Sequence, residues 1–387
     1  CTIRRSSHAL LPDRSAIETD VNTLRDLFEA LQDEDCVLFA HVGGRPANVA
    51  YAHDAKLKTA VEVHSNWGTF EWILTDSFEH GHRVGVVSNS DGHKCRPGAG
   101  SPGATDFGAY GGLTCFLAPE LTRDALFASM RRRHHYGTSG IRLHMDVRVC
   151  FKDDAQLFER DPAHFDTTPS STTEAIMGDI VRCDEDSVEL AIQLETEAPI
   201  ERVDILNGAD EIETLRCYGR DDLGSRVKIL WQGAEYRGRG RNTRWSGSFY
   251  FHGGVVQQMT PVNRWNHDTQ LELLNGREIR FQAVTSGNFG GLELVFDSLE
   301  NIKAEIKTNL VTGIMALAEL GLEDHTLEAG GLERKIRVIR LPDELTQCSL
   351  RRKVTVPLTK GRDNPIWVRV ATADGHLAWS SPIYLID

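Results

Sequence analysis

Residues 36–41, Cys-Val-Leu-Phe-Ala-His, form the first of three short apolar runs that each end in a potential metal ligand. The second is Thr59-Ala-Val-Glu-Val-His64 and the third is Val84-Gly-Val-Val-Ser-Asn-Ser-Asp-Gly-His93. Runs of four or five apolar residues bounded by glycine and polar residues are typical of buried parallel strands. In α/β architectures, chemistry collects at the carboxyl ends of such strands. The pattern therefore predicts one site that is assembled from separate strands.

The composition limits the classes of partner. The chain has 387 residues, and 56 acidic against 43 basic side chains give a net charge of −13. This charge disfavours sequence-independent binding to nucleic acid or to an anionic membrane, and no apolar run reaches the ~18 residues that span a bilayer. The eight cysteines include no Cys-x-x-Cys pair and are too sparse for a disulfide scaffold. We expect a soluble, cytoplasmic protein with a small-molecule substrate and no nucleic-acid or membrane partner; the composition does not indicate an oligomeric state.

Residues 1–145 alternate between apolar runs and amphipathic segments, which indicates an α/β domain with a largely parallel sheet. Helices are expected over residues 20–33, 69–80 and 122–133, and strands over 36–40, 59–64, 84–89 and 112–117. A closed barrel needs seven or eight β-α units, and only about four are present. We therefore expect the second half of a barrel whose first half lies upstream of Cys1.

The pattern changes after residue 145. Residues 146–175 contain the polar run 166–173 and are expected to be a linker. Residues 176–387 show period-two alternation with Asn-Gly turns at 207–208 and 275–276, which favours antiparallel strands in a sandwich-like β domain. The clearest alternating segments are residues 187–194, 200–206, 279–284, 335–340 and 367–370.

Asp91 and His93 form the sharpest local signal for a metal site. Residues i and i+2 of an extended segment point to the same side, so this carboxylate and imidazole can bind one ion. Oxygen and imidazole ligands together suit Zn, Mn or Fe better than Ca. His41 directly follows its strand, and Arg45 in the next loop is a candidate to bind a phosphate or carboxylate.

The other histidines and acids leave more alternatives open. Glu62 and His64 share one face of their strand and are candidate ligands, hydrogen-bonding partners that support a ligand, or residues of an exposed strand end. His8 is a further candidate ligand with no deciding context. His80 and His82 flank Gly81 before a strand, and solvation in a loop is the preferred interpretation of both.

The motifs at 41–46, 61–65 and 90–93 resemble later motifs of the PHP (polymerase and histidinol phosphatase) superfamily of metal-dependent phosphoesterases. The closest likeness is to the PHP-like family catalogued as domain of unknown function 3604. The resemblance implies a distorted (β/α)₇ barrel that holds two or three metal ions. By this resemblance His41 matches a late histidine ligand, Asp91 and His93 match the closing pair, and Glu62 matches the strand motif between them. The opening His-x-His pair has no counterpart here, so we expect an N-terminally truncated member.

These observations predict a metal-dependent hydrolase that uses metal-activated water, with phosphoesters favoured as substrates by the resemblance. Asp91 is expected to coordinate or bridge the metals, His41 and His93 to ligate them, and Arg45 to neutralise the charge of an anionic substrate. An alternative is a non-catalytic protein whose β-sandwich binds a carbohydrate or a partner and whose α/β part is degenerate.

Overall fold

The computed structural model describes residues 21, 23–42, 47–91, 109–238, 242–264 and 266–387. Strands make up 52% of the described residues and helices 9%. The strands form a four-stranded sheet, a twelve-stranded sheet and two five-stranded sheets, and none of these closes into a barrel within the described residues. The expected half of a (β/α)₇ barrel is therefore wrong.

The four-stranded sheet contains the three apolar runs. Its strands are β1 (Leu38–Ala40), β2 (Lys58–Ser65), β3 (Gly68–Thr69) and β4 (Gly85–Ser88). Strands β1 and β4 pair with β2 in parallel, one on each side, and β3 forms a short antiparallel hairpin with the end of β2. The carboxyl ends of three neighbouring strands therefore lie at one edge of this sheet.

Three short α-helices accompany the sheets within the described residues. They are α1 (Leu24–Ala30), α2 (Trp72–Glu79) and α3 (Arg123–Arg131). Thr23 caps α1 in a reciprocal capping box with Asp26, and the Thr122 hydroxyl caps α3 by accepting from the Ala125 amide. No helix in the described ranges combines the length and the apolar composition that crossing a bilayer requires.

The twelve-stranded sheet explains why the barrel prediction failed. Val61 and Val63 of β2 share one core with Ile73 of α2 and with Trp367 and Trp379, which belong to strands of the large sheet. A continuous apolar run indicates that a strand is buried on both faces. Here an antiparallel sheet from the far end of the chain contributes to that burial, so a ring of further β-α units is not needed.

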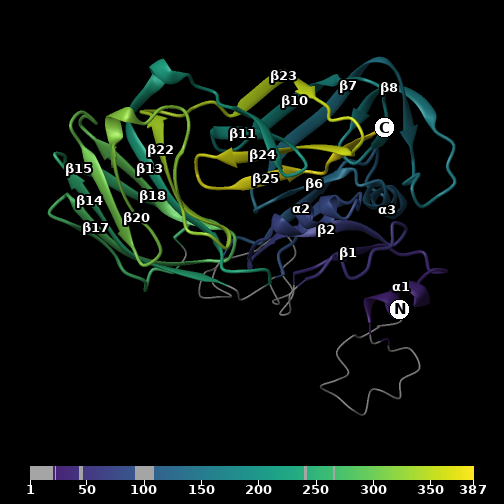
Figure 1. The fold of residues 1–387 in the computed structure, drawn as a ribbon, viewed down its shortest axis with the longest axis horizontal. Coiled ribbons are helices and arrows are strands. Elements are labelled where there is room, and N and C mark those ends of the chain that lie inside the picture. The colour runs from purple at the N-terminus through teal and green to yellow at the C-terminus, as the bar shows by residue number, and fades with distance from the viewer. Residues whose placement is uncertain (1–20, 22, 43–46, 92–108, 239–241, 265) are drawn as a thin grey trace, which may run out of the picture.

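The large sheet joins distant parts of the sequence (Figure 1). It contains β5 (Leu113–Phe116), β6 (His135–Thr138), β7 (Leu143–Phe158), β8 (Ser170–Ile176), β9 (Ile180–Arg182), β10 (Ser187–Thr196), β11 (Ile200–Asn207), β12 (Asp210–Leu215), β23 (Ser349–Pro357), β24 (Asn364–Thr372), β25 (Leu377–Ser380) and β26 (Ile383–Ile386). Strands β5 and β6 continue the sheet beyond β25. Residues 146–175, expected to be a linker, contain most of β7 and β8.

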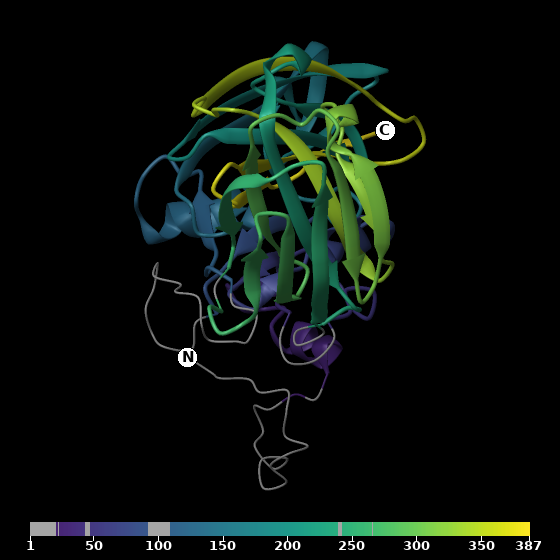
Figure 2. The same cartoon turned by 90° about the vertical axis from the view of Figure 1, so that its left-hand side faces the viewer.

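The two five-stranded sheets pack face to face as a sandwich, which Figure 2 turns toward the reader. One sheet contains β13 (Leu223–Ala234), β15 (Val256–Val262), β18 (Phe289–Phe296), β21 (His325–Glu328) and β22 (Leu332–Pro342). The other contains β14 (Thr243–His252), β16 (Leu271–Leu274), β17 (Glu278–Thr285), β19 (Lys303–Thr308) and β20 (Thr312–Ala316). Alternating aromatic side chains such as Phe249, Phe251 and Phe281 fill the space between the sheets.

Candidate functional site

The carboxyl ends of β1, β2 and β4 bring together four polar side chains. His41 directly follows β1, Glu62 lies within β2, and Asn89 and Asp91 follow β4. The Nδ1 atom of His41 lies 2.8 Å from Glu62 Oε1, and the Nε2 atom of the same ring lies 3.8 Å from Asp91 Oδ2. The fold thus brings His41 and Asp91, fifty residues apart in the chain, to one place from separate strands.

Glu62 orients the His41 ring. This carboxylate is only 2% exposed, and its Oε1 accepts from His41 Nδ1 while its Oε2 accepts from Asn89 Nδ2 at 2.7 Å. An ionised carboxylate can only accept hydrogen bonds, so the His41 proton is fixed on Nδ1. In the neutral form of the ring, the lone pair then lies on Nε2, the nitrogen that faces Asp91. In this arrangement Glu62 is an orienting residue rather than a metal ligand.

Asp91 adopts an unusual backbone conformation, with φ of 42°. Positive φ is uncommon for residues other than glycine, although aspartate tolerates it better than most, and such strain is concentrated at functional sites. The indole Nε1 of Trp67 donates to the Asp91 carbonyl oxygen at 3.2 Å, which helps to hold this backbone. The Asp91 side chain is 13% exposed and that of His41 is 41% exposed. The pair is therefore reachable from solvent.

His64 lies on the same strand but has a different role. Its ring is buried, with Nδ1 2.9 Å from the Thr69 hydroxyl and Nε2 2.9 Å from the Tyr110 carbonyl oxygen. Burial lowers the pKa of His64 to about 4, so the ring is neutral at physiological pH. Because both nitrogens are engaged in hydrogen bonds, His64 holds the β2–β3 hairpin against the segment around Tyr110.

Three residues of the predicted site, His8, Arg45 and His93, lie outside the described residues. Among the residues that the structure describes, no group of three or more histidine, cysteine, aspartate or glutamate side chains is arranged to hold a metal ion. His41 and Asp91 therefore supply two facing donor atoms of the predicted set, with Glu62 behind one of them.

Sequence reasoning missed the role of Asn89 and a second group of histidines. The signal for Asn89 is its place directly after β4, level with Glu62. His82, which was expected to be solvated, instead stacks on His53 with ring centroids 4.0 Å apart. Burial lowers the pKa of His53 to about 2 and that of His82 to about 4. Both rings are therefore neutral packing elements at neutral pH.

The sandwich contacts the hairpin next to the strand that carries Glu62. The Thr69 amide of β3 donates to the Ser286 carbonyl oxygen at 3.0 Å, so the turn after β17 lies directly against the β2–β3 hairpin. The same hairpin provides Trp67, which bonds to the Asp91 backbone. One hairpin therefore contacts both the sandwich and the Asp91 backbone.

Comparison with known proteins gives one match. A sequence model described as "Protein of unknown function (DUF3604)" matches residues 76–212. That region begins in α2, includes Asn89 and Asp91, and extends into β12 of the large sheet. Neither the curated proteins nor the solved structures give a match to this chain.

Proposed function

We propose that this chain belongs to a metal-dependent hydrolase, with phosphoesters as the favoured substrates. The main support is the facing pair of donor atoms, His41 Nε2 and Asp91 Oδ2, 3.8 Å apart at the carboxyl ends of parallel strands. The resemblance of residues 41–46, 61–65 and 90–93 to PHP motifs provides the substrate class and belongs to the same proposal.

The described residues fit part of a coordination shell for Zn, Mn or Fe. Two ligands of one ion bind at about 2.0–2.2 Å each, so a separation of 3.8 Å is close to what one shared ion requires. A metal-bound histidine usually donates its other ring N–H to a carboxylate, and Glu62 accepts that hydrogen bond from His41. The burial of Glu62, which is 2% exposed, distinguishes this pair from an exposed histidine–glutamate pair such as His252–Glu305.

Each residue of the proposed site would have a separate role. Asp91 and His41 would hold the cation, and Glu62 would keep the Nε2 lone pair of His41 aimed at it. A divalent cation bound by these residues would supply a water of lowered pKa, toward ~7, and would polarise phosphoryl oxygens. The partial exposure of the His41 ring leaves room for a substrate to approach the pair from solvent. The role of Arg45, which is to neutralise the charge of an anionic substrate, is inferred from the sequence pattern alone.

The test measures bound metal and turnover in three variants of this chain. We expect stoichiometric Zn, Mn or Fe in the purified protein by mass spectrometry, and hydrolysis of p-nitrophenyl phosphate or its bis-ester that a chelator abolishes. Asp91→Ala and His41→Ala should each lose the metal and the hydrolysis. His252→Ala is the matched control, because His252 pairs with Glu305 on the exposed surface of the sandwich and should leave both unchanged.

A metal-free protein would contradict the proposal, as would variants of His41 and Asp91 that retain full metal content. Either result would favour the non-catalytic alternative. Hydrolysis that persists at full rate in Asp91→Ala would exclude this site as its source.

A further inference from the structure

Two histidines stack on each other where the segment 50–56 meets the connection between α2 and β4. His53 belongs to this segment, which contains neither helix nor strand, and His82 lies between Glu79, the end of α2, and the beginning of β4. The ring centroids of His53 and His82 are 4.0 Å apart, and the ring planes differ by 11°. The rings of His164 and His80 lie beside the pair, with centroids 6.1 Å from His53 and 5.8 Å from His82. Separate parts of the fold thus bring four imidazoles together.

The ring nitrogens of the stack lack hydrogen-bond partners. Both nitrogens of His53 and the Nδ1 atom of His82 are buried, and no described residue bonds to any of them. A neutral imidazole has one N–H donor and one acceptor, and leaving such groups unpaired in the interior lowers stability. An apolar pair would fill the same space without this cost. The arrangement therefore points to a role that requires the chemistry of imidazole.

The charged and titratable groups that face the two rings are cations or other imidazoles. Lys58 of β2 and His164 act on both rings, and His80 acts on His82. Lys58 is only 3% exposed, and its Nζ donates to the Ala52 carbonyl oxygen at 3.1 Å. A proton added to either ring would therefore place a second positive charge beside a buried ammonium group.

The carboxylates of the neighbouring segments have other partners. Asp54 Oδ1 accepts from two backbone amides of its own turn, at 2.8 and 2.9 Å. Asp161 pairs with Arg83, and Asp76 of α2 pairs with Arg237 of the sandwich. No carboxylate of the described chain acts on either stacked ring. An imidazolium in the stack would thus be buried without a counter-ion, which is costly.

The direction of the pH effect follows from these surroundings. Burial and the charge of Lys58 lower the pKa of His53 to about 2 and that of His82 to about 4. A histidine exposed to water has a pKa near about 6.5. If the segment opens, both rings reach water and bind protons that they do not bind in the closed state. The closed state is therefore fully stable above about pH 6.5 and loses stability as the pH falls toward about 4.

We propose that the His53–His82 stack is a pH-dependent contact that holds the segment 50–56 against the fold at neutral pH and releases it on acidification. The residues on either side of the segment, Val49 and Leu57, are buried and anchor its ends. Its hydrogen bonds toward α1 are exposed, so its closed position depends on the histidine stack and on Lys58. This contact does not depend on the proposed hydrolase activity.

Amide hydrogen exchange on the full chain, at about pH 7.5 and about pH 5, tests the proposal after correction for the intrinsic pH dependence of exchange. The readouts are the amides of Tyr51 and Lys56, which donate to side chains of their own segment or of Asn48. The ratio of open to closed states should rise about 30-fold from the titration of His82 alone. The double variant His53→Gln/His82→Gln cannot take up these protons, so the ratio should change less than about threefold.

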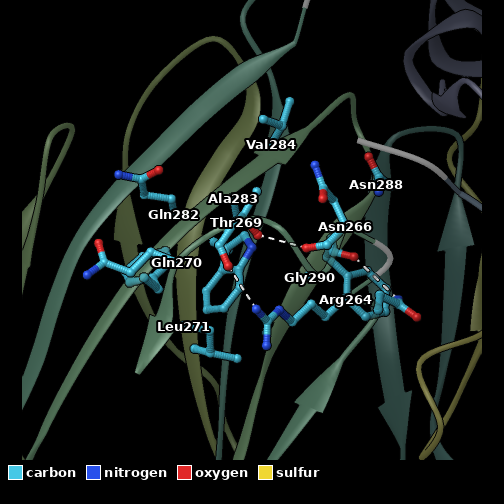
Figure 3. A pocket seen from close by; sticks show the side chains of 15 residues that line it. Arg264, Asn266, Thr269, Gln270, Leu271, Gln282, Ala283, Val284, Asn288 and Gly290 are labelled. Atoms are coloured by element: carbon cyan, nitrogen blue, oxygen red, sulfur yellow. Dashed lines mark hydrogen bonds between the residues drawn. The ribbon is translucent and has the colours of Figure 1, made fainter. Parts of the chain in front are cut away.

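The turn 266–269 of the sandwich is an internal control (Figure 3). The Asp268 amide donates to Asn266 Oδ1 at 3.0 Å, and the Thr269 hydroxyl donates to the Asn266 carbonyl oxygen at 2.9 Å. His267 of this turn is already exposed, so opening does not change its hydration. Protection of the Asp268 amide should therefore be equal at the two pH values.

A matched variant and a direct titration complete the test. His252→Gln removes an exposed histidine of the sandwich and should leave the response of the segment 50–56 unchanged. NMR titration of the His53 and His82 rings in the folded chain does not depend on how well the double variant packs. The proposal is overturned if the segment is equally protected at both pH values, if the double variant keeps the full response, or if both rings titrate near about pH 6.5.

Discussion

Glu62 is the residue on which the candidate metal site most depends, although it does not face the cation position. Both of its oxygens are engaged, one by His41 and one by Asn89, and the side chain is buried. A charged carboxylate inside an apolar strand is costly unless its oxygens are satisfied. Its presence there indicates that its role is to hold the His41 ring in one tautomer.

Glu62→Gln should therefore weaken metal binding without removing a ligand. The variant has no negative charge behind His41. Its amide has one acceptor oxygen where the carboxylate has two, so its NH₂ group would face either the His41 N–H or the Asn89 NH₂, both of which are donors. Loss of such an outer carboxylate typically lowers metal affinity about 10–100-fold, which a competition titration with a fluorescent zinc chelator would measure. Glu305→Gln alters a similar histidine–glutamate pair on the exposed surface and should have no effect. Equal affinities for the two variants would contradict the orienting role.

Buried neutral histidines predict how stability depends on pH. His135 is 1% exposed, its Nδ1 donates to the Val86 carbonyl oxygen at 2.7 Å, and burial lowers its pKa to about 4. In the unfolded chain the same ring has a pKa near about 6.5. Between these two values the unfolded state binds a proton that the folded state does not. The stability is therefore fully present above about pH 6.5 and is lost as the pH falls toward about 4.

The pH effect can be assigned to this residue with one variant. His135 should contribute roughly 3 kcal/mol to the loss, because each unit of pKa shift is worth about 1.4 kcal/mol. His135→Asn does not titrate in this range, so its free energy of unfolding should fall less than that of the unmodified chain between about pH 7 and pH 4.5. Urea titrations at several pH values measure both. If the two curves remain parallel, His135 is not the titrating group.

At the scale of elements, local sequence patterns predicted the three α-helices but only nine of the 26 strands of the described residues. The expected helix over residues 122–133 is α3 at Arg123–Arg131, and the strand expected over 59–64 is β2 at Lys58–Ser65. Alternation over residues 187–194 likewise corresponds to β10. These elements are determined by residues close in the sequence, which form helix caps and periodic apolar patterns. Such local patterns can be identified in a single sequence.

The pairing between elements was not predictable in the same way. Strands β5 and β6 are followed by β7 in sequence, yet β6 pairs with β25 near the end of the chain. An apolar run indicates that both faces of a strand are covered and does not indicate what covers them. For the same reason the sequence predicted that strand ends form the site. It predicted neither the role of Asn89 nor the contact between the turn after β17 and strand β3.

The turn at Gly287 is where this fit is tightest. Gly287 has φ of 79°, and a Cβ there would lie 1.8 Å from the Thr69 carbonyl oxygen. Gly287→Ala should destabilise the protein by about 2–5 kcal/mol, which combines the left-handed backbone cost with the steric clash. Gly361 has φ of 75°, and a Cβ there would meet no atom within 4 Å, so Gly361→Ala should cost only about 1–2 kcal/mol. Urea unfolding gives both values, and equal losses would show that the contact with β3 is not close.

At the scale of the whole molecule, buried charges join the sandwich to the large sheet. Lys228 of β13 forms a short hydrogen bond to Glu201 of β11 and donates to the Ala373 carbonyl oxygen at 3.1 Å. The two charged side chains are only 2% and 5% exposed. Arg369 of β24 similarly connects Asp204 with Glu71, which directly precedes α2. The sheets are thus held in one arrangement by pairs that tolerate little displacement.

The Lys228–Glu201 pair provides a direct test of this connection. Lys228→Met leaves a buried carboxylate without its partner and should lower the free energy of unfolding by about 3–5 kcal/mol. The double variant Lys228→Met/Glu201→Leu removes both charges and should be more stable than the single one, because the cost lies mainly in the uncompensated charge. Lys353→Met breaks an exposed pair with Glu189 and should cost less than about 1 kcal/mol. Urea unfolding of the three variants measures these differences. If Lys228→Met lowers the free energy of unfolding no more than Lys353→Met does, this buried pair does not hold the sandwich to the large sheet.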